Sequence, residues 1–281
     1  MSSNNRKQMR QNRFCFLNRK KAPLLVPSCH IFPIILIVVN LIYAGTALAV
    51  GGISNSKIIV PNTETVEKGH FEVEPFFGLV LIDDADDTVQ FDGGVRFTLG
   101  VLQNMEAGAN FGYLRIDDSD LADRDSNFGD IEVGLKYRFL DEDKNIPFSL
   151  AYQGGVTFPT SGDDAPWVFE LGGLILTKNF TDEFSMDADF VFALIEDDSI
   201  GFVSEIGFGY FLKPWFQPVV ELAYFFENPD SEDNLSAITL TGGFTAPVND
   251  VLTIIIGISS DIYTNNVDNV VVLTAAFTFL F

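Results

Sequence analysis

The sequence predicts an all-β protein: a transmembrane, antiparallel, up-and-down β-barrel of about twelve strands, preceded by a cleaved signal peptide. Three observations support this prediction. From residue 70 onwards, apolar and polar residues alternate with a period of two in one segment after another. Residues 1–49 have the composition of an export signal. The chain ends on VVVLTAAFTFLF, where soluble proteins usually carry residues that tolerate water.

The first segment, residues 1–49, resembles a secretory signal peptide. Seven basic residues and no Asp or Glu are followed by an apolar stretch from Ile31, and Ala47 and Ala49 form an A-x-A cleavage site. We therefore expect cleavage after Ala49. The alternative is a retained membrane anchor, because residues 31–50 carry no charge and are long enough to cross a bilayer. The helix breaker Pro33 and the small residues at the C-terminal end of the apolar stretch favour cleavage.

Composition limits the function of the remaining chain. Removing the seven basic residues of the leader leaves 10 of the 17 Lys and Arg against 39 Asp and Glu, a formal charge of −29. Nucleic acid is thereby excluded as a partner, since phosphate binding needs a basic surface. Both cysteines, Cys15 and Cys29, lie in the leader, so the mature chain has none. With 28 Phe and 47% hydrophobic residues the chain is not disordered, and its acidic charge must be segregated from its apolar surface.

After a weakly patterned N-terminal lead, residues 50–69, the alternating segments form the predicted barrel of residues 70–281. We place the lead in the periplasm; whether it also plugs the barrel stays open. The clearest strand is DIEVGLKYRF, in which Ile131 to Phe139 alternate with Asp130 to Arg138. The predicted strands are 70–81, 88–99, 104–114, 130–139, 146–158, 167–178, 183–195, 199–211, 215–227, 235–246, 251–262 and 269–281.

The connections between these strands alternate between long acidic and shorter ones, as in bacterial outer-membrane barrels with long outer loops and tight periplasmic turns. Both termini then lie on the periplasmic side. A soluble sandwich or lipocalin-like barrel is the alternative, but its interior would be overfilled by so many large aromatic side chains. We expect the apolar face to contact outer-membrane lipid. The terminal Phe277, Phe279 and Phe281 resemble the signal that barrel-assembly machinery recognises, which makes that machinery an expected partner.

One stretch resembles a known family. In NFGDIEVGLKYRFLDEDKNIPFSLAYQGGVTFPTSGDD, residues 127–164, the order G-D-x-x-x-G-x-K-Y-R, a polar turn, and a strand ending in P-T-x-G is similar to the outer-membrane transporter family associated with the meta-pathway of phenol degradation. The matching positions are Gly129, Asp130, Gly134, Lys136, Tyr137, Arg138, Pro159, Thr160 and Gly162. The resemblance implies a barrel for passage of small, often aromatic or hydrophobic, compounds.

Charged residues on the polar faces are the candidates for lining a lumen. They are Asp92, Arg96, Glu106, Asp130, Glu132, Lys136, Arg138, Glu170, Asp187, Asp189, Glu205 and Glu221. These side chains would either set the selectivity of a water-filled path or form a hydrogen-bonded network that closes a narrow barrel. Nine are acidic and three basic, so a conducting lumen would prefer cations or neutral solutes. Glycine pairs such as Gly154-Gly155 would bend the wall or let a ligand approach closely.

Enzymatic function is not expected, because His70, at the periplasmic start of the first predicted strand, is the single histidine after the leader and nucleophile–histidine catalysis would depend on it alone. The sequence contains no zinc spacing, phosphate loop or dinucleotide motif. Acidic loops such as DDADD lack the spacing of a calcium loop, so we expect a solvated surface there and no metal or cofactor. We predict a channel or transporter for a small-molecule solute in the bacterial outer membrane. A non-conducting structural or surface-interaction barrel is the alternative, and the oligomeric state is open.

Overall fold

The computed structural model describes residues 50–54, 57–83, 88–117, 125–160, 166–196, 199–229 and 234–281, and only the backbone of residues 92, 114–117 and 125–127. The predicted signal peptide with Ala47 and Ala49 lies outside the described residues. Everything that is described belongs to one compact unit.

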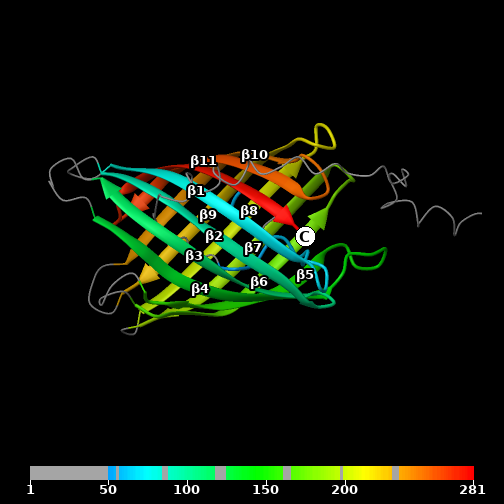
Figure 1. The fold of residues 1–281 in the computed structure, drawn as a ribbon, viewed down its shortest axis with the longest axis horizontal. Helices are drawn as coiled ribbons and strands as arrows, with labels where there is room; N and C mark the ends of the chain where they lie inside the picture. Colours follow the sequence, from blue (N-terminus) through cyan, green and yellow to red (C-terminus); the bar gives the residue numbers. More distant parts are fainter. Residues whose placement is uncertain are drawn as a thin grey trace, which may run out of the picture. The chain divides into compact units, whose positions relative to one another are not determined.

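Twelve antiparallel strands form one closed barrel, which confirms the predicted fold class and strand number (Figure 1). Each strand pairs with its neighbours in sequence, and β1 pairs with β12 to close the wall. The strands are β1 (Phe71–Asp83), β2 (Val89–Leu102), β3 (Met105–Asp117), β4 (Asp125–Leu140), β5 (Ser149–Phe158), β6 (Val168–Asn179), β7 (Phe184–Ile195), β8 (Ser199–Tyr210), β9 (Gln217–Asn228), β10 (Leu235–Pro247), β11 (Leu252–Asn265) and β12 (Asn269–Leu280).

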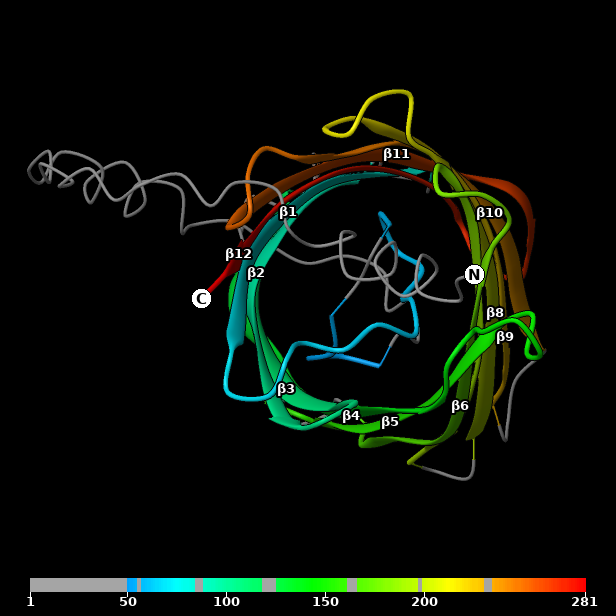
Figure 2. The same cartoon turned by 90° about the vertical axis from the view of Figure 1, so that its right-hand side faces the viewer.

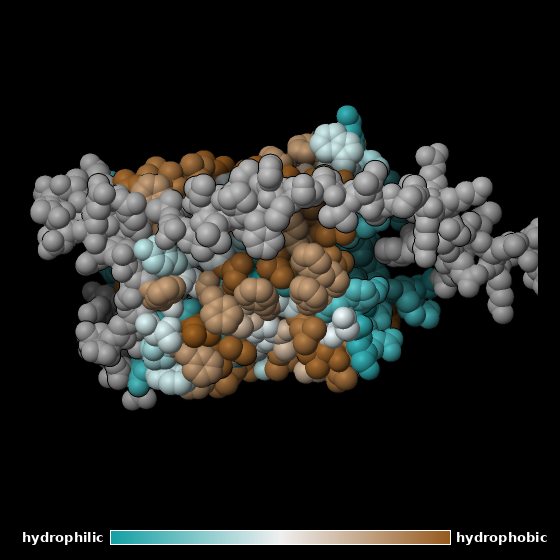
Figure 3. All heavy atoms as spheres, viewed as in Figure 1, coloured by the Kyte–Doolittle hydropathy of each residue, from teal (hydrophilic) through white to brown (hydrophobic). Residues whose placement is uncertain are grey.

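The outer wall of the barrel is apolar. Its exposed side chains include Phe97, Phe169, Phe190 and Ile256, each more than two-fifths exposed, and brown apolar residues gather over the middle of the wall in Figure 3. A closed barrel satisfies all of its backbone hydrogen bonds internally, so such a surface can contact hydrocarbon. Even-stranded antiparallel barrels of this type span bacterial outer membranes, which is where we place the protein. No helix in the described ranges is long and apolar enough to cross a membrane.

The strands extend further into the predicted loops than the sequence pattern indicated. β3 continues to Asp117 and β4 begins at Asp125, whereas the sequence predicted 104–114 and 130–139. The contrast between long and short connections is therefore weaker than predicted. The connection between β4 and β5, predicted to be short, spans residues 141–148, whereas the connection between β7 and β8, predicted to be long, spans only residues 196–198. Which rim faces the periplasm stays a prediction.

The last residue completes the closure of the barrel. The N–H of Phe281 donates to Phe71 O at 2.9 Å, the N–H of Phe71 donates to Phe281 O at 3.0 Å, and the two rings stack with centroids 5.0 Å apart. Phe281 also stacks on Phe279 at 6.5 Å. The terminal aromatics thus have a structural role in addition to the proposed role in assembly.

Replacing Phe281 with Ala separates these two roles. We expect a loss of about 1 kcal/mol from the ring contact but a much larger fall in the amount of heat-modifiable barrel in outer membranes. Phe71→Ala removes the same stacked pair and leaves the terminal residue intact. If both variants assemble equally well, Phe281 is no assembly signal.

Candidate functional site: a lumen occupied by the N-terminal segment

Residues 50–69 are here called the N-terminal segment, and its described residues 50–54 and 57–66 lie inside the barrel (Figure 2). Figure 2, which views the barrel end-on, shows this blue trace within the ring of strands. Val60, Lys57 and Thr63 of the segment are at most 1% exposed. The sequence placed these residues as a lead before the barrel and left their role open; their location inside the wall is the main feature that the sequence did not predict.

The first anchor is a buried cluster of β3, β4 and the segment. Glu106 accepts hydrogen bonds from Ser54 N at 2.7 Å, from Ser54 Oγ at 2.8 Å and from Val66 N at 2.6 Å. Lys136 Nζ is 3.1 Å from Glu106 Oε1 and donates to Ser54 O at 3.0 Å. Both charged side chains are fully buried. One carboxylate therefore binds two separate points of the segment while its charge is balanced from the wall.

The second anchor lies on β6 and β7. Lys57 forms an ion pair with Asp187, and both side chains are 2% exposed. Asp187 also accepts a hydrogen bond from Thr177 Oγ1 at 2.6 Å, and Thr177 Oγ1 accepts one from Thr63 N at 3.0 Å. Removing one partner from a buried ion pair is costly, so this contact holds the segment in one register.

The third anchor is Glu221 on β9. Its carboxylate accepts the backbone N–H groups of three consecutive residues, Ile58 at 3.0 Å, Ile59 at 3.1 Å and Val60 at 3.2 Å. The segment has no β-partner at this point, so its N–H groups would otherwise be unpaired inside the barrel. A wall carboxylate replaces the missing strand.

Apolar contacts alternate with these polar anchors. Val50 and Ile53 pack against Ala151, Ile175 and Val191 of β5, β6 and β7. Ile58 packs against Val219 of β9, Ile255 of β11 and Ala276 of β12, and Phe76 of β1 packs against the same cluster. The inner wall therefore carries apolar residues where the segment lies against it, which departs from the polar lumen that the alternation predicted.

Inward-facing glycines provide the space that the segment needs. A Cβ added at Gly134 would come within 2.2 Å of Gly51 O, and one at Gly257 within 2.6 Å of Ile58 Cγ2. At Gly207 the nearest atom would be Lys57 Cδ at 2.9 Å. Close approach to a peptide of the same chain thus accounts for these three glycines, whereas the sequence pointed to glycine pairs such as Gly154-Gly155 and not to these positions.

The predicted lumen charges fall into three groups. Glu106, Lys136, Asp187 and Glu221 contact the N-terminal segment directly, and Arg138 pairs with Glu64 of the segment. A second group bonds within the barrel: Arg96 pairs with Glu74 at 2.8 Å, Asn110 donates to Glu132 at 2.8 Å, Thr160 N donates to Asp130 at 2.8 Å, and Gln153 donates to Asp189 at 3.0 Å. Glu170 and Glu205 are buried at 4% and 3% exposure. The side chain of Asp92 lies outside the described residues.

Sequence reasoning missed the partners of these charges. Ser54, Lys57 and Thr63 belong to the segment that carried no clear pattern. Thr177 and Gln153 occupy polar positions of predicted strands, but they carry no charge and were not considered. Lys57 and Lys136 are the residues from which the site could have been predicted, because a basic residue inside a barrel this acidic needs a carboxylate nearby.

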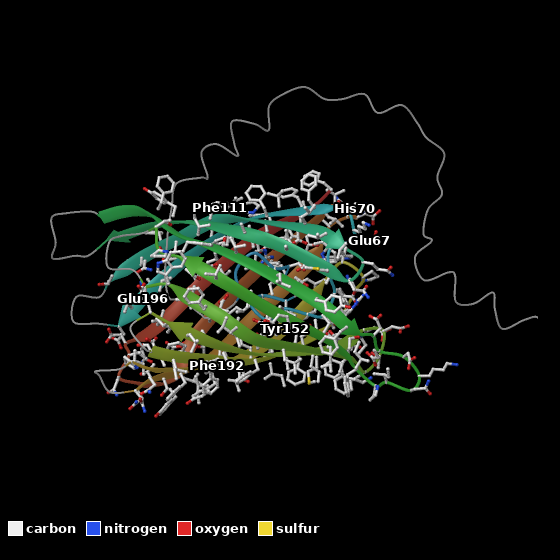
Figure 4. The ribbon with its side chains drawn as sticks, turned by 90° about the horizontal axis from the view of Figure 1, so that it is seen from below. Glu67, His70, Phe111, Tyr152, Phe192 and Glu196 are labelled. Carbon is white, nitrogen blue, oxygen red and sulfur yellow. The ribbon has the colours of Figure 1, made fainter. Side chains whose placement is uncertain are left out.

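His70 lies at a rim and not in the lumen. It is half exposed, and its Nδ1 is 3.8 Å from the exposed carboxylate of Glu67. Figure 4 shows His70 and Glu67 together at one rim and Glu196 at the other. Among the residues that the structure describes, no group of three or more His, Cys, Asp or Glu is arranged to hold a metal ion.

Glu142, which lies in the connection between β4 and β5 outside the membrane-spanning strands, gives a pH prediction. Partial burial raises the pKa of Glu142, but hydrogen bonds from Lys178 and Asn179 outweigh it and hold the pKa below its usual value. A depressed carboxyl pKa adds stability that is present above the unfolded-state pKa and is lost as pH falls through the folded-state pKa. Glu142→Gln should therefore lower the urea midpoint at pH 7, and the difference should vanish in acid. An equal difference at all pH values would contradict this.

Solved structures share the fold. The COG4313 outer membrane channel from Pseudomonas putida F1 is 11% identical, with a TM-score of 0.65, and the match covers 78% of this chain and 98% of that one. The NanC porin is 10% identical with a TM-score of 0.51, covering 74% and 98% of the two chains. The KdgM porin in complex with disordered oligogalacturonate is 9% identical with a TM-score of 0.50, covering 73% and 98%. No curated protein is significantly similar in sequence.

The family resemblance of β4 and β5 extends over most of the barrel. The family described as "Putative MetA-pathway of phenol degradation" matches residues 92–267, from β2 to the end of β11. The match includes Glu106, Lys136, Asp187 and Glu221, the four wall residues that anchor the N-terminal segment. By this match, which covers more than half of its length, the chain belongs to the phenol-degradation family of that description.

Proposed function

We propose that the protein is a passive outer-membrane channel for small solutes, narrowed by its own N-terminal segment. The observation that carries the proposal is the contrast between the two faces of the closed wall, apolar outside and largely polar and ionisable inside. A water-exposed path is the usual reason for a barrel to keep such an interior. We further propose that it is not an enzyme, since its single described histidine lies at the rim without a nucleophile.

Two features support small and weakly polar solutes. The description of the family refers to phenol degradation, which suggests aromatic compounds. The inner wall also offers apolar side chains, Phe76, Val219 and Ile255, beside its carboxylates. A large polar solute would have to displace the segment together with its buried anchors, so we expect exclusion of oligosaccharides.

The charge of the wall gives the expected selectivity. Lys57 and Lys136 are paired with Asp187 and Glu106, whereas Asp189 and Glu205 form no ion pair with any described basic residue, so this pair keeps a negative charge even when a proton neutralises one of the two. The net field of the lumen is therefore negative, and we expect cations to be preferred over anions. The reversal potential of the purified protein in a planar bilayer under a KCl gradient measures this preference, and anion selectivity would refute it.

The second candidate is a barrel that conducts nothing, favoured by the complete burial of Lys57, Lys136 and Thr63. Liposome swelling with small aromatic and sugar solutes distinguishes the two. Swelling with phenol-sized solutes supports the channel. A folded, heat-modifiable barrel that passes no solute and gives no conductance steps supports the structural role.

A further inference from the structure

One group of buried side chains in the wall is not used by the N-terminal segment. Asp189 on β7 and Glu205 on β8 lie directly opposite each other in the strand register, both facing inwards. They are 5% and 3% exposed, and residues paired in this way have their Cβ atoms about 5 Å apart, so two carboxyl groups share one buried place. Two like charges so close are costly to bury together, so we expect the pair to hold one proton when no cation balances it.

A third side chain, Gln153, reaches the same place from β5. It is fully buried, and its Nε2 donates to Asp189 Oδ2 at 3.0 Å. The structure places Gln153 beside irregular pairing: the register shifts between Gln153 and Gly155 on β5 and between Glu170 and Gly172 on β6. Bulges of this kind often re-aim a side chain next to a functional site.

Three oxygen atoms of this group have no hydrogen-bond partner. They are Gln153 Oε1, Asp189 Oδ1 and Glu205 Oε2, each with almost no exposed area. A buried carbonyl or carboxylate oxygen without a partner is costly and calls for an explanation by an unseen ligand. All three are hard oxygen donors, and neither nitrogen nor sulfur ligands stand beside them, so the chemistry they fit is a hard cation.

The residues around these three oxygen atoms exclude water and supply no balancing positive charge, which favours a bound cation. Each residue of the group has a buried apolar neighbour two positions away on its own strand: Ala151, Val191 and Val203, all at most 3% exposed. Val50 and Ile53 pack against Ala151 and Val191. Asp187 on β7 and Glu221 on β9 interact electrostatically with the pair, and both are acidic. The nearby ammonium, Lys57, is bound to Asp187. No described basic side chain therefore neutralises Asp189 or Glu205.

We propose that Gln153, Asp189 and Glu205 bind a hard cation of the Ca²⁺ class on the inner wall of the barrel. The cation replaces the proton held between the two carboxyl groups: one Ca²⁺ enters, one proton leaves, and both carboxylates and the amide oxygen become ligands. Two carboxylates supply the charge that balances a divalent ion, and water completes a coordination shell of the flexible kind that calcium accepts. The site does not depend on conduction, so it stands or falls separately from the proposed channel function.

Calcium binding is measured by isothermal titration of CaCl₂ into the full-length barrel, purified from outer membranes in detergent and freed of lipopolysaccharide, which binds calcium itself. We expect one Ca²⁺ per barrel, with a proton released. Glu205→Gln and Gln153→Leu should each weaken binding about tenfold or more. Glu183→Gln, which removes an exposed carboxylate at the rim, is the matched control for binding to the acidic surface and should bind as the unmodified protein does.

An infrared measurement on the unmodified protein covers the case in which the variants fail to fold. The carbonyl band of protonated, buried carboxyl groups should lose intensity when CaCl₂ is added. Calcium binding that is equal in Glu205→Gln and in the unmodified protein would overturn the proposal in favour of surface binding. An unchanged carbonyl band at saturating calcium would overturn it in favour of a carboxyl pair that only shares a proton. Silent bilayers with intact calcium binding would contradict the channel function alone.

Discussion

Lys136→Met is expected to destabilise the barrel by about 3–5 kcal/mol, because it leaves the Glu106 carboxylate buried without its counter-charge. Lys136 also donates to Ser54, so the N-terminal segment should loosen as well. The measurements are urea unfolding in detergent and the rate at which trypsin cleaves after Lys57, which is buried in the intact protein.

A double variant separates charge from packing. Glu106→Gln combined with Lys136→Met removes both buried charges, and we expect it to recover part of the lost stability, since burying an unpaired charge costs more than replacing the pair. Lys144→Met, at an exposed rim position, is the control and should have almost no effect. A single variant as stable as the control would show that Glu106 and Lys136 are not paired in the lumen.

Deletion of residues 50–66 is expected to raise the single-channel conductance several-fold. The deletion removes Lys57 and the three N–H groups bound to Glu221, along with the apolar residues that pack on both sides of the lumen. Residues 67–69 are retained because Gly69 N donates to Gly100 O at 2.8 Å and leads the chain into β1.

Three wall carboxylates lose contacts with the segment in the deleted protein. Glu106 keeps its ion pair with Lys136, but Asp187 loses Lys57 and Glu221 loses the segment's N–H groups, so the cation preference should rise together with the conductance. Heat-modifiability on gels confirms that the barrel has folded before conductance is compared. Unchanged conductance in a folded deletion variant would mean that the segment does not limit passage.

The alternation of residues was enough to predict the barrel, because each wall residue faces either lipid or lumen and the period of two follows directly from strand geometry. It also placed Glu106, Lys136, Asp187 and Glu221 on the inner face. It could not predict the N-terminal segment in the lumen. That segment is neither strand nor helix, and its position depends on contacts between residues as distant in sequence as Lys57 and Asp187. Periodicity contains no information on such pairs.

The inward-facing glycines illustrate the same limit. Gly134 and Gly257 are inward-facing positions without a side chain. From the sequence alone, curvature of the wall, a ligand or a neighbouring peptide would each explain them. Only the approach of Gly51 and Ile58 distinguishes these explanations. Likewise, the alternation gives no reason to single out Phe76 and Ile255, which pack in one cluster with Ile58.

The position of the N-terminal segment in the lumen of the folded barrel can be tested with a pair of introduced cysteines. The predicted mature chain has no cysteine, and a Cβ at Gly257 would lie 2.6 Å from Ile58 Cγ2 and 3.5 Å from Cγ1. With both positions replaced, Ile58→Cys and Gly257→Cys, the Cβ atoms fall within reach of a disulfide. We expect spontaneous, nearly complete disulfide formation in barrels taken from outer membranes, detected as a mobility shift that reduction reverses. Two free thiols, both modified rapidly by a water-soluble maleimide, would contradict it.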